Sequence, residues 1–147
     1  MTEEEVCRVL SGSAVLQGVD PSATRFLVQV GEVRRFEEGD VLMRQGAGSP
    51  SLHFILSGSV HVEHSRRSDE RPVRLAELGV GQTVGEMGLL TGAGRSATVV
   101  AAGPTETLEI GRASFDEAAA GFPMLHRMLT GVLRSRLVDH GPNRAGL

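Results

Sequence analysis

The chain has 147 residues, of which 40% are apolar and 22% charged, and its formal net charge is -3. This length suits one globular domain, and the composition is not that of a disordered chain. The negative charge argues against a protein that mainly binds a phosphate backbone, and a single cysteine, Cys7, excludes an intramolecular disulfide and a Cys-based zinc site.

The N-terminus carries three consecutive glutamates and no hydrophobic stretch behind them, which is unlike a signal peptide. No apolar run approaches the roughly 20 residues that cross a bilayer. The absence of Trp and Tyr leaves few platforms on which nucleic-acid bases could stack. We therefore expect a cytoplasmic protein without nucleic-acid partners and without direct membrane insertion.

Two helices are predicted over residues 2–31. Thr2 and Glu5 form a capping box ahead of apolar residues at helical spacing. Asp20-Pro21 gives a second start signal, an N-cap followed by proline in the first helical turn, and Gly31 gives the stop.

Residues 33–110 change to short segments with strand-like alternation, separated by glycine-containing and proline-containing turns. The strand-like segments are 41–43, 52–56, 60–62, 73–75, 97–100 and 107–110. The polar stretch 65–72 between two of them predicts an exposed hairpin tip. Many short strands with regular turns predict an antiparallel β jelly-roll barrel.

Helical patterning returns over residues 114–140. Ser114 and Glu117 form a second capping box, Gly121 offers a stop, and Phe122-Pro123 restarts the helix. An apolar face then follows over about four turns, made by Leu125, Met128, Leu129, Val132, Leu133 and Leu137. This apolar face must pack against another part of the protein. No linker or internal repeat indicates a second domain, so we expect a single domain over residues 1–147.

The segment from Val84 to Ala101 interrupts the strand pattern and reads VGEMGLLTGAGRSATVVA. Backbone N–H groups at a glycine-rich turn that opens a short helix can bind an anion, and Arg95 would supply the forked donors that a phosphate prefers. Glu86 would repel a phosphate, so it makes sense only if it faces hydroxyl groups, as an acid does at a ribose. A sugar phosphate satisfies both residues.

This segment resembles the phosphate-binding cassette of the cyclic nucleotide-binding domain family. The matching residues are Gly85-Glu86-Met87-Gly88-Leu89-Leu90 and Arg95-Ser96-Ala97-Thr98. Earlier positions resemble the family's first strands, namely Phe36, Gly39, Gln45-Gly46, Phe54-Ile55-Leu56, Gly58 and Val60. The resemblance covers about residues 33–140 and implies a jelly roll with N-terminal helices, a short cassette helix and C-terminal lid helices.

The resemblance also implies roles for the cassette residues. Arg95 would pair with the phosphate oxygens, Glu86 would accept from the ribose 2'-hydroxyl, and backbone amides at Met87 and Ala97 would complete the cradle. Ser96 is compatible with either base, since family members with a hydroxyl here include cGMP-selective ones and bacterial cAMP receptors. Leu89 matches a hydrophobic position that contacts the helix after the barrel.

The expected function is a non-catalytic regulatory domain that binds a cyclic nucleotide, cAMP rather than cGMP, and couples it to the C-terminal helix. No cofactor is expected. The effector is undefined, a homodimer through the C-terminal helix is compatible with the pattern, and Thr130, Arg134 and Arg136 are unranked candidates for reading the base. Leu125 to Leu137 could equally be ordinary core or a dimer seam.

Three other functions fit the sequence less well. A metal-binding cupin would need His61 and His64, with His53, to converge, but strand alternation separates His61 from His64, and we expect no metal site. A transcription regulator would need a DNA-binding segment after His140, where only about seven residues remain. A degenerate jelly roll that binds only proteins conflicts with the intact Gly85, Glu86 and Arg95.

Overall fold

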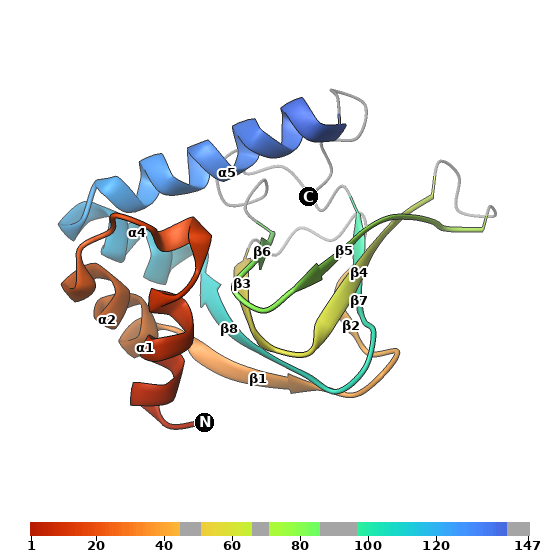
Figure 1. Cartoon of the computed structure of the whole chain (residues 1–147), viewed down its shortest axis with the longest axis horizontal. Helices are drawn as coiled ribbons and strands as arrows, with labels where there is room; N and C mark the ends of the chain where they lie inside the picture. Colours follow the sequence, from red (N-terminus) through yellow and green to blue (C-terminus); the bar gives the residue numbers. More distant parts are fainter. Residues whose placement is uncertain (45–50, 66–70, 86–96, 141–147) are drawn as a thin grey trace.

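The computed structural model describes residues 1–44, 51–65, 71–85 and 97–140, with the side chains of the last helix described as far as Val132. Its strands form two antiparallel four-stranded sheets, in the orders β1-β8-β3-β6 and β2-β7-β4-β5, with a layer of helices to one side (Figure 1). The strands are β1 (Glu32–Phe36), β2 (Val41–Met43), β3 (Ser51–Ser57), β4 (Ser59–His64), β5 (Val73–Gly79), β6 (Thr83–Val84), β7 (Thr98–Ala101) and β8 (Thr105–Gly111).

The predicted jelly roll is confirmed, but its described strands form two separate sheets and not a closed barrel. The chain changes sheet at its turns: β1 pairs with β8 while the next strand, β2, pairs with β7 in the other sheet. The strands over 41–43, 52–56, 60–62, 73–75, 97–100 and 107–110 are present, most of them longer than predicted. The two sheets face each other across an interior that both line.

The N-terminal helices α1 (Glu3–Ser11) and α2 (Pro21–Val30) confirm the predicted caps. The Glu5 backbone N–H donates to the Thr2 hydroxyl at 3.2 Å, and the Ser22 N–H donates to the Asp20 carboxylate at 2.8 Å. These side chains satisfy helix N–H groups that have no partner within the helix. A short 3-10 helix over Ala14–Leu16, which the sequence patterns did not indicate, joins the two.

The C-terminal helices are α4 (Arg112–Gly121) and α5 (Met124–His140). The predicted capping box at Ser114 and Glu117 is wrong, because α4 begins directly where β8 ends, with Gly111 at the N-cap and no side-chain cap. Ser114 therefore lies inside the first turn. The stop at Gly121 and the restart after Pro123 are confirmed.

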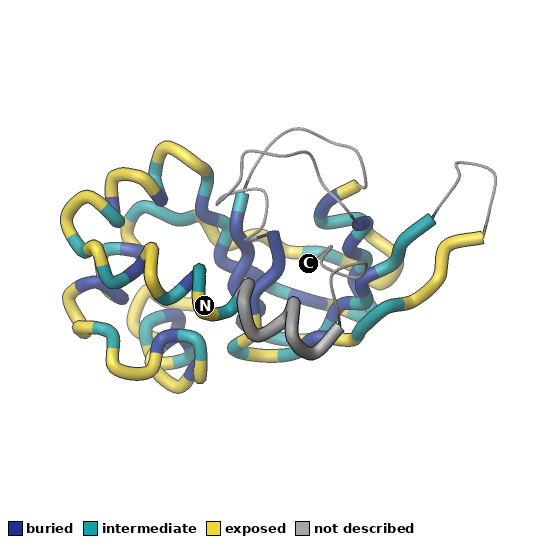
Figure 2. Tube along the Cα trace, turned by 90° about the horizontal axis from the view of Figure 1, so that it is seen from above, coloured by how far each residue is buried: buried dark blue, intermediate teal, exposed yellow. Residues whose placement is uncertain are grey.

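Two apolar clusters hold the layers together. The first joins the helices to the outer face of the sheet that contains β3, and the second fills the space between the sheets. In β3 alternate residues serve the two clusters: Leu52, Phe54 and Leu56 face the helices, while Ile55 faces the opposite sheet. Figure 2 shows this strand region as a run of buried chain at the centre of the molecule.

Strands β4 and β5 form the predicted hairpin, with His64 opposite Val73 at the end of the ladder. The tip at 66–70 lies outside the described residues. The turn from β3 to β4 requires glycine at Gly58, whose φ is +80° and where a Cβ would lie 2.3 Å from the carbonyl oxygen of Pro104.

Candidate functional site between the sheets

Gly85 and Ala97 are the two predicted site residues that the structure describes. Gly85 directly follows β6 in one sheet, and Ala97 directly precedes β7 in the other. The remaining predicted site residues, Glu86, Met87, Gly88, Arg95 and Ser96, lie outside the described residues, as does Leu89. The segment between β6 and β7 thus starts at one sheet and ends at the other.

Gly85 is buried and has a φ of +91°, a left-handed conformation that residues with a Cβ rarely adopt. It follows a strand of only two residues, in which Thr83 pairs with Phe54 and Val84 with His53 of β3. The backbone therefore turns sharply at the first residue of the glycine-acid pair. A side chain at this position would oppose that turn.

Val84 and Ala97 flank the segment and belong to the same apolar cluster between the sheets. Val84 is fully buried and Ala97 is 3% exposed. The rest of the cluster comes from both sheets and consists of Met43, Ile55, Val60, Val62, Leu78 and Val99. The two ends of the cassette segment therefore both lie at the interior of the sandwich, next to buried apolar side chains.

A polar cluster lies on the inner face of the β1-β8-β3-β6 sheet, and the sequence patterns did not single it out. His53 is 1% exposed, its Nδ1 lies 2.8 Å from the Thr107 hydroxyl oxygen, and its Nε2 lies 3.2 Å from a Glu109 carboxylate oxygen. The Phe36 ring meets the imidazole edge-on at 6.2 Å. The available signal was the alternation of the polar Thr107 and Glu109 with the apolar Leu108 and Ile110.

Glu109 is the charge centre of this cluster. Its carboxylate also accepts hydrogen bonds from Arg34 Nε at 3.0 Å and from the Ser51 hydroxyl at 3.3 Å. The contact with His53 is the largest cause that lowers the pKa of Glu109, from 4.5 to about 2, and Arg34 adds to it, although partial burial acts in the opposite direction. The carboxylate is therefore ionised throughout the physiological range.

His61 lies on β4, in the other sheet from His53. His61 and Glu63 are part-exposed on the face opposite the buried Val60 and Val62, as strand alternation predicted, and His61 Nε2 lies 3.3 Å from an Arg74 guanidinium nitrogen. Within the described ranges no group of three His, Cys, Asp or Glu side chains could hold a metal ion.

The first turns of α5 belong to the core. Leu125 and Leu129 are fully buried in the cluster that joins the helices to the sheet, and Met128 packs partly against it. This half of the predicted apolar face is therefore occupied within the molecule. The side chains of Leu133 and Leu137 lie outside the described residues, and the helix backbone continues along the end of the sandwich (Figure 1).

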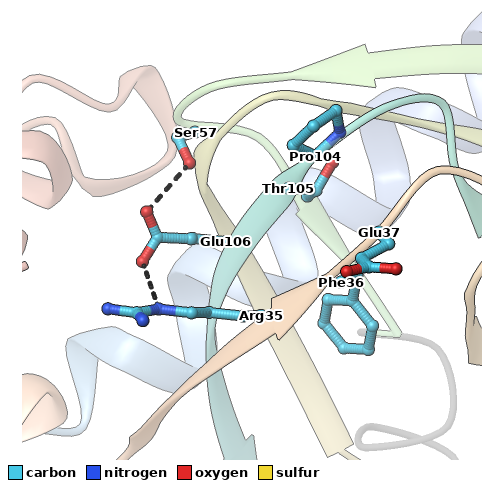
Figure 3. A pocket seen from close by; sticks show the side chains of 7 residues that line it. All are labelled: Arg35, Phe36, Glu37, Ser57, Pro104, Thr105 and Glu106. Atoms are coloured by element: carbon cyan, nitrogen blue, oxygen red, sulfur yellow. Dashed lines mark hydrogen bonds and ion pairs between the residues drawn. The ribbon is translucent and has the colours of Figure 1, made fainter.

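A cavity of about 420 Å³ opens at the far end of β3 from this site (Figure 3). Phe36, Pro104 and Thr105 line it, together with the ion pair of Arg35 and Glu106, whose closest atoms are 3.3 Å apart. Ser57, which also lines it, is four residues along β3 from His53, or roughly 13 Å at about 3.3 Å per residue. Phe36, however, both lines the cavity and meets the His53 imidazole, so the cavity and the polar cluster share this residue.

Comparison with known proteins identifies the relatives of this chain. A model of the cyclic nucleotide-binding domain matches residues 33–121. Among curated proteins, the Pycsar effector protein PaPycTIR of Pseudomonas aeruginosa is 33% identical over 138 residues, which are 86% of this chain and 42% of that protein.

Two solved structures share the fold at substantial identity. The regulatory subunit of a cAMP-independent protein kinase A from Trypanosoma brucei has a TM-score of 0.78 and 28% identity, with 97% of this chain and 48% of that one covered. A cAMP-binding acyltransferase from Mycobacterium smegmatis has a TM-score of 0.71 and 32% identity, with 93% and 42% covered. The chain therefore spans less than half the length of these three relatives. No helix of the described part of the chain is long and apolar enough to span a bilayer.

Proposed function

This chain belongs to the cyclic nucleotide-binding domain family, and on that basis we propose that it is a non-catalytic sensor domain that binds cAMP more tightly than cGMP. The observation that supports this most is the placement of Gly85 and Ala97. They fix the two ends of the cassette segment at opposite sheets of the sandwich, next to an apolar interior. A ligand with an anionic phosphate and an apolar base fits such a position.

In this proposal the cassette residues bind different parts of the ligand. Arg95 pairs with the phosphate, backbone N–H groups around Met87, Gly88 and Ala97 donate to it, and Glu86 accepts from the ribose hydroxyl. Gly85 supplies the left-handed turn that starts the cradle, which is consistent with its φ of +91°.

The relatives differ in how they are described with respect to cAMP. The acyltransferase from Mycobacterium smegmatis, at 32% identity, is described as cAMP-binding. The kinase subunit from Trypanosoma brucei has the same fold and is described as cAMP-independent. The fold therefore does not choose the base, and Ser96 is compatible with both, so the candidates for reading the base are Thr130, Arg134 and Arg136 of α5.

We further propose that the bound nucleotide shifts the part of α5 beyond Val132. The first turns are fixed by Leu125 and Leu129, which are fully buried, so a ligand can move only the later turns without opening the core. Such a shift requires different contacts with the ligand in the two helix positions. An effector, or a second copy of this chain, would bind at that end, and the expected compartment is the cytoplasm.

Replacement of Arg95 by alanine tests the site assignment. We expect Arg95→Ala to weaken cAMP binding at least tenfold, because a buried phosphate would lose a charged hydrogen-bond donor, which costs about 1.5–3 kcal/mol. The measurement is calorimetric titration of protein that has been freed of bound nucleotide by unfolding and refolding.

The matched control is Arg25→Ala, since Arg25 is an exposed arginine on α2. It removes the same charge from the protein away from the cassette, and the affinity should stay within twofold of wild type. Equal affinities of the Arg95 variant and the wild type would show that the phosphate is not held by Arg95.

A further inference from the structure

The strand that leads into the cassette is short. Strand β6 has two residues, lies at the edge of its sheet and, among the strands that the structure describes, pairs with β3. The turn before it is held by backbone hydrogen bonds: the Gly81 N–H donates to the Ile55 carbonyl at 2.9 Å, the Ile55 N–H donates to the Gln82 carbonyl at 3.0 Å, and the Gln82 N–H donates to the Gly79 carbonyl at 3.1 Å. The Ser13 hydroxyl also donates to the Gly81 carbonyl. The pairing with β3 therefore contributes to the position of Gly85.

His53 is the ladder partner of Val84, the residue immediately before Gly85. Partners in an antiparallel ladder place their side chains side by side on the same face of the sheet. Both side chains are buried, and Ile55, two residues along β3, belongs to the cluster between the sheets. The imidazole therefore lies on the inner face of the sheet, beside the side chain that leads into the cassette.

The imidazole is itself fixed from the other side. Thr107 holds Nδ1 at 2.8 Å, and Glu109 lies 3.2 Å from Nε2 and is in turn held by Arg34 of β1. These contacts tie β3 to β8 and, through Arg34, to β1 on the inner face of the sheet. An apolar residue would fill the same space but would leave Thr107 and Glu109 without this partner.

We propose that His53 is a positioning residue for the nucleotide site, which holds β6 and Gly85 in place through its contacts with Thr107 and Glu109. The inference rests on the proposed binding of cAMP. In this proposal His53 does not contact the nucleotide. His53 acts through Val84 on the backbone at Gly85, where the phosphate-binding segment begins.

The test compares two replacements of His53 by calorimetric titration of cAMP into the nucleotide-free full chain. His53→Phe keeps a ring but removes both polar contacts, and we expect at least fivefold weaker binding. His53→Gln keeps a side chain that can donate and accept hydrogen bonds, and we expect affinity within about twofold of wild type.

Val6→Ala is the control that distinguishes a general loss of stability from a loss of positioning at the nucleotide site. Val6 is a buried residue of α1 in the helix-facing core, so this variant loses stability away from the cassette, and its affinity should not change. If His53→Phe does not fold, Thr107→Val replaces it, because it removes the partner of Nδ1 at nearly constant volume, and at least threefold weaker binding is expected.

Wild-type protein that does not bind cAMP would refute the proposed function. Wild-type binding that His53→Phe leaves unchanged, or that His53→Gln weakens as much as His53→Phe does, would overturn the inference about His53 alone. If Thr107→Val is used in place of His53→Phe, an affinity for cAMP equal to that of the wild type would likewise overturn the inference about His53.

Discussion

Glu109 shows how one residue links the edge of the sheet to its interior. Its carboxylate contacts Arg34 on the exposed edge strand and His53 in the interior, and 28% of its side chain remains exposed. A carboxylate whose pKa is lowered on folding stabilises the protein above its unfolded pKa, and that stabilisation is lost as the pH falls toward the folded value. For Glu109 this interval runs from 4.5 down to about 2.

Glu109→Gln should therefore reduce the acid sensitivity of the protein. Between pH 5 and pH 3 the wild type should lose on the order of 1–2 kcal/mol of unfolding free energy through this group, a value reduced because solvent screens the part-exposed pair. Urea unfolding at the two pH values measures the loss, with Glu38→Gln in the exposed turn after β1 as the control. If the Glu109 variant shows the same acid dependence as the wild type, the ion pairs do not stabilise the fold.

The elements that the sequence predicted well are those fixed by local chemistry. The side chains of Thr2 and Asp20 accept hydrogen bonds from backbone N–H groups within three residues. The residues that predict each cap are therefore the residues that form it. The start of α4 was predicted wrongly because the end of β8, and not a local cap, determines it. Strand β6 was missed because two residues are too few to show a period.

Helix α5 carries a prediction of its own. If cAMP fixes its later turns, amide hydrogens of residues 133–140 should exchange at least fivefold more slowly with saturating cAMP. Amides near Leu125 and Leu129 should change little, because those side chains are already fully buried. Hydrogen exchange followed by mass spectrometry measures both regions in one experiment. Unchanged exchange at 133–140 under saturation would show that the helix does not respond to the nucleotide.

At the scale of the whole molecule, the sequence predicted the fold class but not the pairing of the strands. Alternation and turns indicated a jelly roll, whereas the pairing of β1 with β8 joins opposite ends of the strand region and has no local signal. The edge strand β1 is mostly exposed and contains Glu32, Arg34 and Arg35, so its sequence does not show the alternation of apolar and polar residues that predicts a strand. The division into two sheets follows from these long-range pairings.

The candidate site could be predicted only in part. The motif around Gly85 and Arg95 indicated a sugar phosphate, and the family match over residues 33–121 agrees with that interpretation. The polar cluster of His53, Thr107 and Glu109 could not be predicted with the same certainty, because it forms only when β3 and β8 pair. That residues 1–147 form a single domain stays a prediction.

The central claim is that this domain binds a cyclic nucleotide and prefers cAMP. Calorimetric titration of cAMP and of cGMP into nucleotide-free wild-type protein tests it most directly. We predict saturable binding of one cAMP per chain with a Kd of about 1 μM or below, equivalent to roughly 8 kcal/mol, and weaker binding of cGMP. No heat and no thermal stabilisation with either nucleotide would contradict the claim and would favour a jelly roll that binds only proteins.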